Sequence, residues 1–337
     1  MPSSSKYAAA VLAALISLSS AQSHTNCDPM DKTCPADEGS TTSTFSYDFT
    51  QSSDLSQWNT TSGTVTSSEN GAEFTINEKG DSPTIQTEFY IFFGEVTVTM
   101  QAAPGTGIVS SAILESDDLD EVDWEMLGGY TTKIQTDYYG KGDSGDYGRW
   151  TWVNVSNPQT NFYTYKWVWT EEQLTWSIDG TVVRTLKYED AVNGTRYPQT
   201  PMTVRLGIWA GGDSDNAEGT IEWAGGETDY SDGPYTMYVK SVDIVSYYPA
   251  ESYNYTDKSG SMDSIDIIGS VSGTTSVSSP STSSTSSASS QSSDSFITWA
   301  SSATPTVIAP AASLGFTGSL GTLSVMIMAF MIILSFV

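Results

Sequence analysis

The chain has 337 residues, of which 13 are Lys or Arg and 40 are Asp or Glu, so its formal net charge at pH 7 is −27. A surface this acidic repels the phosphate backbone of nucleic acids and argues against a nucleic-acid partner. With one histidine and two cysteines, the chain is short of the four ligands that zinc prefers, so we expect no metal and no cofactor.

The first residues have the pattern of a secretory signal peptide. Lys6 precedes an apolar stretch from Tyr7 to Leu18, and the small residues Ser19, Ser20 and Ala21 follow it. The apolar stretch is too short to span a bilayer. We therefore expect residues 1–21 to be removed and the remaining protein to be secreted.

Two features after this segment agree with a secreted protein. Cys27 and Cys34 are the only cysteines, and in an oxidising compartment two cysteines this close most simply form a disulfide. Sequons of the N-x-S/T type predict N-glycosylation, and they occur at Asn59, Asn154, Asn193 and Asn254.

Alternation of apolar and polar residues dominates the part that we expect to fold, residues 22–255. Leu174, Trp176 and Ile178 alternate with polar residues and are followed by Asp179-Gly180, a dipeptide typical of a tight hairpin turn. Many such strands without a long amphipathic helix predict an all-β fold of two packed antiparallel sheets, a sandwich or jelly roll. The same alternation runs through residues 95–100 and 202–209.

The segment LDEVDWEML, residues 119–127, contains the candidate catalytic residues. If it is a strand, Glu121, Asp123 and Glu125 point to one face, and the three apolar residues between them point to the other. The apolar side chains can then pack in the core and hold three carboxyl groups in a groove.

The spacing of these acids suits the cleavage of a glycosidic bond. Four residues of strand separate the two glutamate backbones by about 13 Å, and side chains that lean together bring their carboxyl groups near the ~5 to 5.5 Å of retaining glycosidases. Asp123 between them can help to keep the pair in opposite protonation states. A solvated acidic run or a calcium loop is the alternative, because acids also precede the motif at Glu115, Asp117, Asp118 and Asp120.

The C-terminal part differs in composition from the rest of the chain. Residues 256–312 are rich in Ser and Thr and predict an extended, O-glycosylated stalk. Leu323 to Val337 is almost wholly apolar, and no Lys or Arg follows Lys258. This pattern is typical of a cleaved GPI-anchor signal, which we place at residues 313–337, with a retained tail anchor as the alternative. We therefore expect a GPI-anchored protein of the cell surface.

Four motifs closely resemble those of fungal Crh-type transglycosylases in glycoside hydrolase family 16. They are DEVDWE at residues 120–125, IQTDYYGKG from Ile134, GIWAGGD from Gly207 and GTIEWAGGETDY from Gly219. The chain departs from the family's FHTY-like strand, because it reads Phe162-Tyr163-Thr164-Tyr165 and lacks an imidazole there.

The resemblance implies a β-jelly roll and a role for each acid. It makes Glu121 the nucleophile, Asp123 the auxiliary acid and Glu125 the acid/base. It also implies that the enzyme cuts chitin and transfers the new end to β-glucan, which cross-links the cell wall. The partners expected from it are chitin and β-glucan, with the membrane reached through the GPI anchor.

Sugar rings stack on aromatic side chains, and a sugar-binding cleft combines several such rings with a few polar groups. We therefore expect substrate contacts from residues in the family-like segments, namely Gln135, Tyr138, Lys141, Trp209, Glu222 and Trp223.

Two other functions remain open from the sequence. One is a β-glucan hydrolase on the same fold, in which water instead of a sugar accepts the glycosyl unit. The other is a wall lectin or structural mannoprotein without catalysis, although the chain keeps all three acids of the motif.

Overall fold

The computed structural model describes residues 25–145 and 147–270, all within one unit of the chain, Met1–Ser278. The predicted signal peptide at residues 1–21, most of the predicted stalk and the predicted anchor signal at residues 313–337 lie outside these described residues. No helix in the described ranges is long and apolar enough to cross a membrane.

One of the two large sheets is antiparallel and has seven strands. They are β3 (Asn59–Ser62), β6 (Thr84–Gln86), β8 (Ile108–Ser116), β9 (Glu121–Leu127), β10 (Lys133–Tyr139), β11 (Thr151–Asn154) and β15 (Met202–Ala210). Their spatial order is β11-β10-β9-β8-β15-β6-β3, so β9 lies near the middle between β8 and β10.

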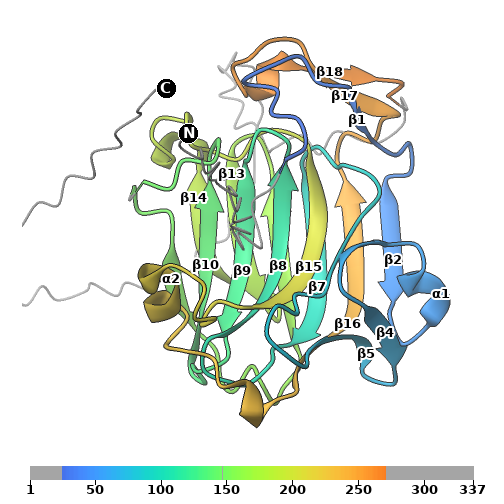
Figure 1. Cartoon of the computed structure of the whole chain (residues 1–337). Coiled ribbons are helices and arrows are strands. Elements are labelled where there is room, and N and C mark those ends of the chain that lie inside the picture. The colour runs from blue at the N-terminus through green and yellow to red at the C-terminus, as the bar shows by residue number, and fades with distance from the viewer. Residues whose placement is uncertain (1–24, 146, 271–337) are drawn as a thin grey trace, which may run out of the picture. The chain divides into compact units, whose positions relative to one another are not determined.

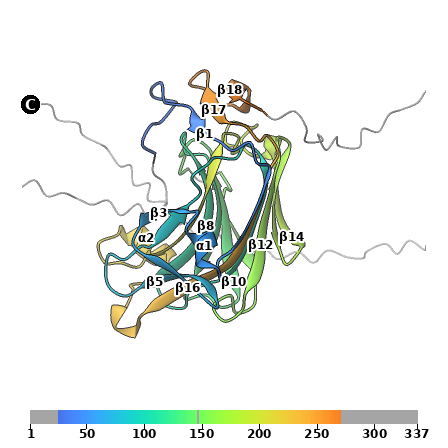
Figure 2. The same cartoon turned by 90° about the vertical axis from the view of Figure 1, so that its right-hand side faces the viewer.

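The second large sheet has eight strands and is also antiparallel. They are β2 (Thr44–Asp48), β4 (Val65–Ser68), β5 (Gly71–Ile76), β7 (Gly94–Gln101), β12 (Tyr163–Trp169), β13 (Gln173–Ile178), β14 (Thr181–Lys187) and β16 (Tyr235–Ser246). Their order is β14-β13-β12-β7-β16-β5-β4, with β2 paired to β16. The two layers, seen in Figures 1 and 2, confirm the predicted two-sheet antiparallel jelly-roll sandwich.

Within the described residues, helices are few and short. The α-helices are α1 (Ser52–Leu55) and α2 (Glu218–Trp223), and the 3₁₀ turns are η1 (Tyr188–Asp190), η2 (Tyr230–Asp232) and η3 (Met262–Ser264). The predicted hairpin is present, because Asp179 and Gly180 both have positive φ angles, 48° and 79°, between the paired residues Ile178 and Thr181. Positive φ at both turn residues matches the twist of the flanking strands.

Aromatic side chains fill the space between the two sheets. Trp124 from β9 and Trp167, Trp169 and Trp176 from the eight-stranded sheet are at most 1% exposed. The indole Nε1 of Trp176 donates a hydrogen bond of 3.1 Å to the main-chain carbonyl of Asp123. One core side chain therefore fixes the backbone of the strand that carries the acids.

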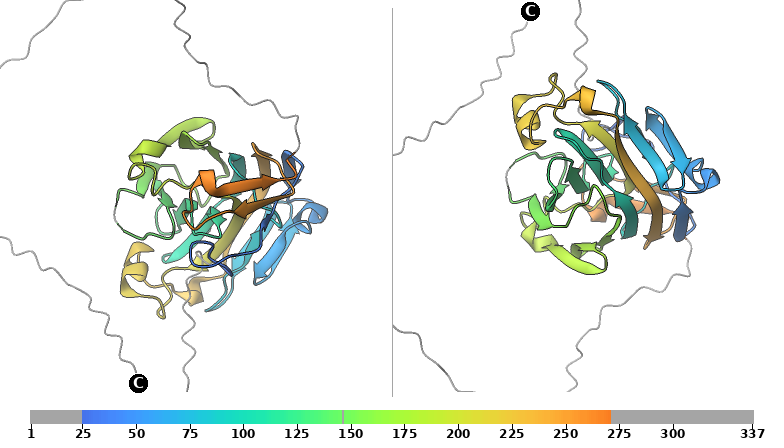
Figure 3. Two further views of the ribbon diagram at one scale, coloured as in Figure 1. Left: turned by 90° about the horizontal axis from the view of Figure 1, so that it is seen from above. Right: turned by 90° about the horizontal axis from the view of Figure 1, so that it is seen from below.

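A third, small sheet lies across one end of the sandwich, as Figure 3 shows from above. We call it the end sheet; it consists of β1 (Asp37–Glu38), β17 (Ser252–Tyr255) and β18 (Ile265–Ile268). Because β18 pairs with β17, the folded part continues past residue 255, where the sequence placed the start of the stalk. The predicted disulfide between Cys27 and Cys34 is present.

The end sheet brings a buried acid against the sandwich. Asp37 on β1 is 5% exposed, and its Oδ2 has no hydrogen-bond partner among the described residues. Burial raises the pKa of Asp37 to about 8, and the charges of Asp117 and Asp118, in the turn between β8 and β9, act in the same direction. The folded protein therefore holds a proton here that the unfolded chain loses above about pH 4.

We expect the wild type to become less stable as the pH rises and Asp37 ionises, and we expect Asp37→Asn to lack this loss of stability. An acid whose pKa is higher in the folded state stabilises the fold below its ordinary pKa, and this stability declines between about pH 4 and pH 8. The variant should have the same unfolding temperature as the wild type at pH 4. At pH 8 its unfolding temperature should be several degrees higher, and its free energy of unfolding should be greater by on the order of 1 kcal/mol or more.

Thermal unfolding at the two pH values is the measurement, with the exposed Asp266→Asn on β18 as the matched control. Equal differences between Asp37→Asn and the wild type at both pH values would contradict the prediction.

Candidate active site

The three candidate acids project from β9 on the face away from the core. Val122, Trp124 and Met126 are fully buried in the core cluster between the sheets. Since successive side chains of a strand alternate, Glu121, Asp123 and Glu125 point to the outer face of the seven-stranded sheet. The alternation predicted from the sequence is therefore present.

The acids are less exposed than the sequence led us to expect. Glu121 is 3% exposed, Asp123 is 1% and Glu125 is 6%. The sequence placed these carboxyl groups in a groove, and in the structure very little of their surface reaches solvent. Three carboxyl groups that lie this close together and are shielded from water cannot all be ionised without a large cost in free energy.

Each acid has one register partner on β8 and one on β10. These partners point to the same face of the sheet, because directly paired residues share a face. The three rows are Glu115, Glu121 and Tyr139; Ile113, Asp123 and Asp137; and Ser111, Glu125 and Gln135.

Two ion pairs flank the acids on opposite sides. Arg205 on β15 pairs with Glu115, which lies beside Glu121. Arg149, just before β11, pairs with Asp137, which lies beside Asp123. The charges that surround the candidate site are therefore organised by two arginines that the sequence did not single out.

Asp123 differs from an ordinary carboxylic acid in its protonation. Burial raises the pKa of Asp123 well above its usual value, and the charges of Glu121, Glu125 and Asp137 act in the same direction. A hydrogen bond with Glu121 adds to this rise. Because such a bond stabilises the neutral acid, Asp123 is the donor and Glu121 the acceptor.

Three of the six expected substrate contacts lie together beside the acids. Gln135 is the register partner of Glu125, and its Oε1 accepts a 3.0 Å hydrogen bond from the indole of Trp223. Trp223, at the end of α2, stacks on Trp209 of β15 with 6.0 Å between ring centroids and 25° between planes. Glu222 is exposed on the same helix.

Two other expected contacts lie elsewhere. Tyr138 is 1% exposed and belongs to the core cluster. It lies three residues after Gln135 on the same strand, so its side chain points to the opposite face of the sheet. The Nζ of Lys141 is 2.8 Å from both carboxyl oxygens of Asp120 and 3.5 Å from Asp118, and this side chain is only 8% exposed. In this structure Tyr138 therefore packs in the core, and Lys141 is held by buried acids.

The acids that precede β9 accept hydrogen bonds from other side chains of this protein. Asp117 accepts a 2.8 Å hydrogen bond from Tyr90, and Thr200 donates to Asp118 at 2.6 Å and to Asp120 at 2.8 Å. Among the described residues no cluster of acids, histidines or cysteines is arranged to hold a metal ion.

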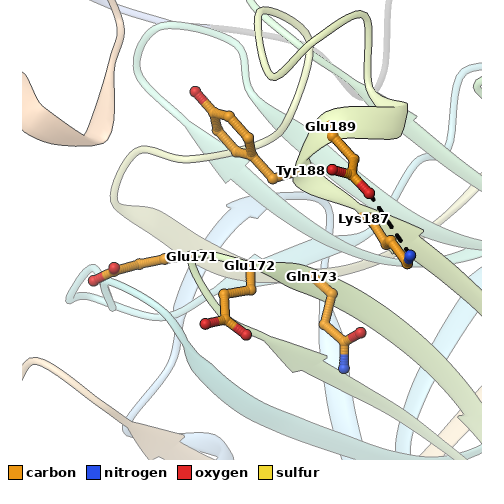
Figure 4. Close-up of a pocket in the computed structure, with 6 residues that line it drawn as sticks. All are labelled: Glu171, Glu172, Gln173, Lys187, Tyr188 and Glu189. Carbon is orange, nitrogen blue, oxygen red and sulfur yellow. Dashed lines mark ion pairs between the residues drawn. The ribbon is translucent and has the colours of Figure 1, made fainter. Parts of the chain in front are cut away.

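A surface pocket occurs on the other sheet, around the β12–β13 and β14–η1 connections (Figure 4). None of its lining residues comes from β8, β9 or β10, so it is separate from the candidate site. They are Glu171, Glu172, Gln173, Lys187, Tyr188 and Glu189.

Comparison with known proteins places these observations in a family. Residues 52–225 match the family described as Glycosyl hydrolases family 16. Crh-like protein 5 of Aspergillus fumigatus is 58% identical over 260 residues, which cover 77% of this chain and 66% of that protein. The chain belongs to glycoside hydrolase family 16. The resemblance seen in its motifs is therefore confirmed.

Solved structures and a further relative are also similar to the chain. The structure of a Crh5 transglycosylase in complex with NAG is 61% identical, covers 72% of this chain and 99% of its own, and has a TM-score of 0.70. A Bacillus licheniformis β-glucanase, 23% identical with a TM-score of 0.51, shares the fold. Crh-like protein 2 of Botryotinia fuckeliana is 50% identical over 73% of this chain and 55% of its own length.

Asp137, Tyr139, Arg149 and Arg205 were not predicted from the sequence. Asp137 and Tyr139 follow Gln135 at intervals of two residues on β10, so strict alternation could have selected them in place of Tyr138. Arg149 gave no local signal, because it meets Asp137 only through the loop that connects β10 to β11.

We expect Lys141→Met to destabilise this family 16 domain. Burial lowers the pKa of Lys141, but the carboxylates of Asp120 and Asp118 outweigh that effect and keep the ammonium charged. Removing it leaves buried carboxylates without their cation, which typically costs about 3–5 kcal/mol.

Denaturant unfolding measures this loss, and the exposed Lys32→Met is the control. A variant of unchanged stability that binds sugar more weakly would instead restore Lys141 as a substrate contact.

Proposed function

We propose that the protein is a retaining cell-wall transglycosylase that cleaves chitin and transfers the cleaved chain to β-glucan. The observation that carries this proposal is the row of three buried carboxyl groups on β9, in a family 16 chain whose relatives are Crh-like proteins. The NAG bound to the 61% identical Crh5 transglycosylase supports a donor built from N-acetylglucosamine.

In the proposed first step, the carboxylate of Glu121 attacks the anomeric carbon of the donor sugar. Glu125 gives its proton to the glycosidic oxygen as that bond breaks, so the leaving chain departs as an alcohol. Asp123, kept neutral by burial and by its acidic neighbours, donates a hydrogen bond to Glu121 and positions it for attack.

In the second step, Glu125 takes the proton from a hydroxyl group of the acceptor glucan. The oxygen then attacks the anomeric carbon and the bond to Glu121 breaks, which restores the free enzyme. Two inversions at the same carbon retain its configuration. Transfer requires that the acceptor reach the intermediate before water does.

Gln135, Trp209 and Trp223 are the residues that we propose as sugar contacts. Indole rings offer flat apolar faces to sugar C–H groups, and the Trp223–Gln135 hydrogen bond links this aromatic pair to the row of Glu125. Glu222 is a further candidate because it lies exposed on the same helix.

We propose, on the sequence pattern, that the protein is secreted and anchored through GPI at the cell surface. The sequons at Asn59, Asn154 and Asn193 are exposed and that at Asn254 is half-buried, which supports glycosylation on the way to the surface. A phosphatidylinositol-specific phospholipase should release the mature protein from membranes of cells that express the full chain. A C-terminal peptide of the mature protein that still contains Phe330 would show a retained tail instead.

We expect Glu121→Gln and Glu125→Gln each to abolish most of the activity. General acid–base assistance alone typically contributes about 10² to 10⁴ in rate, and without the nucleophile no covalent intermediate forms. Both variants should still fold, because each replaces a carboxyl group with an amide of nearly the same shape.

The assay combines chitin oligomers with a labelled β-glucan oligosaccharide and separates hybrid products from hydrolysis products. Glu218→Gln, the same substitution at an exposed position of α2, is the control. Near-normal hybrid formation by either active-site variant would refute the assignment of the acids. A wild type that only hydrolyses at saturating acceptor would identify a glucan or chitin hydrolase.

A further inference from the structure

An ion pair between Asp137 and Arg149 lies beside the candidate acids. Asp137 is on β10, the strand next to β9, and Arg149 lies just before β11. Asp137 is the direct register partner of Asp123, so both side chains lie on the outer face of the sheet. Arg149 pairs with Asp137 and places its guanidinium 4.1 Å from the ring centroid of Tyr139, the partner of Glu121. Asp137 is 3% exposed.

The second sheet holds this pair in place. Arg184 of β14 donates hydrogen bonds to the main-chain carbonyls of Arg149, at 2.6 Å, and of Thr136, at 2.9 Å. Its guanidinium also lies 4.5 Å from the ring of Trp176, the side chain that bonds to the carbonyl of Asp123. The backbone segments that carry Asp123, Asp137 and Arg149 are therefore tied to one point of the opposite sheet.

Charge on Asp137 acts directly on Asp123. Two carboxylates that share a site oppose each other's ionisation, and the charge of Asp137 is among the causes that raise the pKa of Asp123. Burial raises the pKa of Asp137 itself, whereas the charge and hydrogen bond of Arg149 oppose that rise.

Other charged or titratable groups also face this site from each neighbouring element. They are Glu121 and Glu125 on β9, Tyr139 on β10, Glu115 on β8, Arg205 on β15 and Arg184 on β14. Glu115 and Arg205 pair with each other, and Asp137 is the acid on β10 that is paired in register with Asp123.

We propose that Asp137 and Arg149 are positioning residues that set the protonation of Asp123. Arg149 keeps Asp137 charged and oriented, and the charge of Asp137 keeps the proton on Asp123. This inference rests on the proposed role of Asp123 as the auxiliary acid. Its functional consequence is that the ion pair sets the alkaline limit of activity, because a deprotonated Asp123 no longer donates to the nucleophile Glu121.

Both single changes should shift the titration of Asp123 in the same direction. Asp137→Asn removes the neighbouring negative charge and leaves the cation of Arg149 in place, and both effects favour ionisation of Asp123. Its titration midpoint should fall by roughly one pH unit or more. Arg149→Gln removes the cation that keeps the buried Asp137 ionised, so Asp137 takes up a proton and no longer opposes the ionisation of Asp123. The midpoint should fall here too, by a smaller amount because a positive charge is also lost. The double variant is neutral at both positions and should resemble Arg149→Gln.

The experiment follows the ¹³C signal of the Asp123 carboxyl group by NMR across the pH range, assigned with the help of Asp123→Asn. The alkaline limb of the pH–rate profile for hybrid formation is measured in parallel and should move with the midpoint. Glu95→Gln, which breaks the Lys166–Glu95 ion pair on the eight-stranded sheet, is the matched control and should shift neither.

An unchanged Asp123 midpoint in folded Asp137→Asn would overturn the proposal, as would a rise of the midpoint in Arg149→Gln. A uniform loss of rate at every pH without a shift would indicate a purely structural ion pair. If Asp137→Asn does not fold, the comparison of Arg149→Gln and the double variant with the wild type carries the test. The NMR titration does not depend on turnover, so it stands even if the wild type fails to form hybrid products.

Discussion

The burial of three carboxyl groups within seven residues of one strand is the constraint on which the rest of the site depends. Water could stabilise three charges at this spacing, but the outer face of β9 leaves Glu121, Asp123 and Glu125 at most 6% exposed. The protein must therefore leave at least one of them protonated or supply compensating partners. It does both, since Asp123 keeps its proton and two arginines pair with the acids on the neighbouring strands.

The two sheets cooperate in holding this arrangement. The outer face of the seven-stranded sheet carries the candidate acids, but its backbone is fixed from the inside by Trp176 and Arg184 of the eight-stranded sheet. A change in the packing between the layers would therefore reach the acids through the main chain. Regular strands hold side chains in position better than loops do, and this suits the role proposed for the acids.

Protonated acids recur at two separate places in the fold. Asp37 on β1 of the end sheet and Asp123 in the candidate site both have a raised pKa, with burial as the first cause and acidic neighbours as the second. Rising pH therefore weakens both the attachment of the end sheet, where Asp37 loses its proton, and the hydrogen bond that Asp123 donates to Glu121. Folding and the proposed chemistry both favour a mildly acidic medium.

The sequence by itself determined the all-β class, the strand that carries the acids and the Cys27–Cys34 disulfide, because these depend on short-range periodicity and spacing. It identified Gln135, Trp209 and Trp223, which the structure brings together. Tertiary structure alone decided the partners of the acids, because Arg149 and Arg205 reach Asp137 and Glu115 through pairings between distant segments. It also decided that Lys141 pairs with the buried Asp120 and Asp118, since the local sequence around a lysine is the same whether it forms an ion pair or binds a sugar.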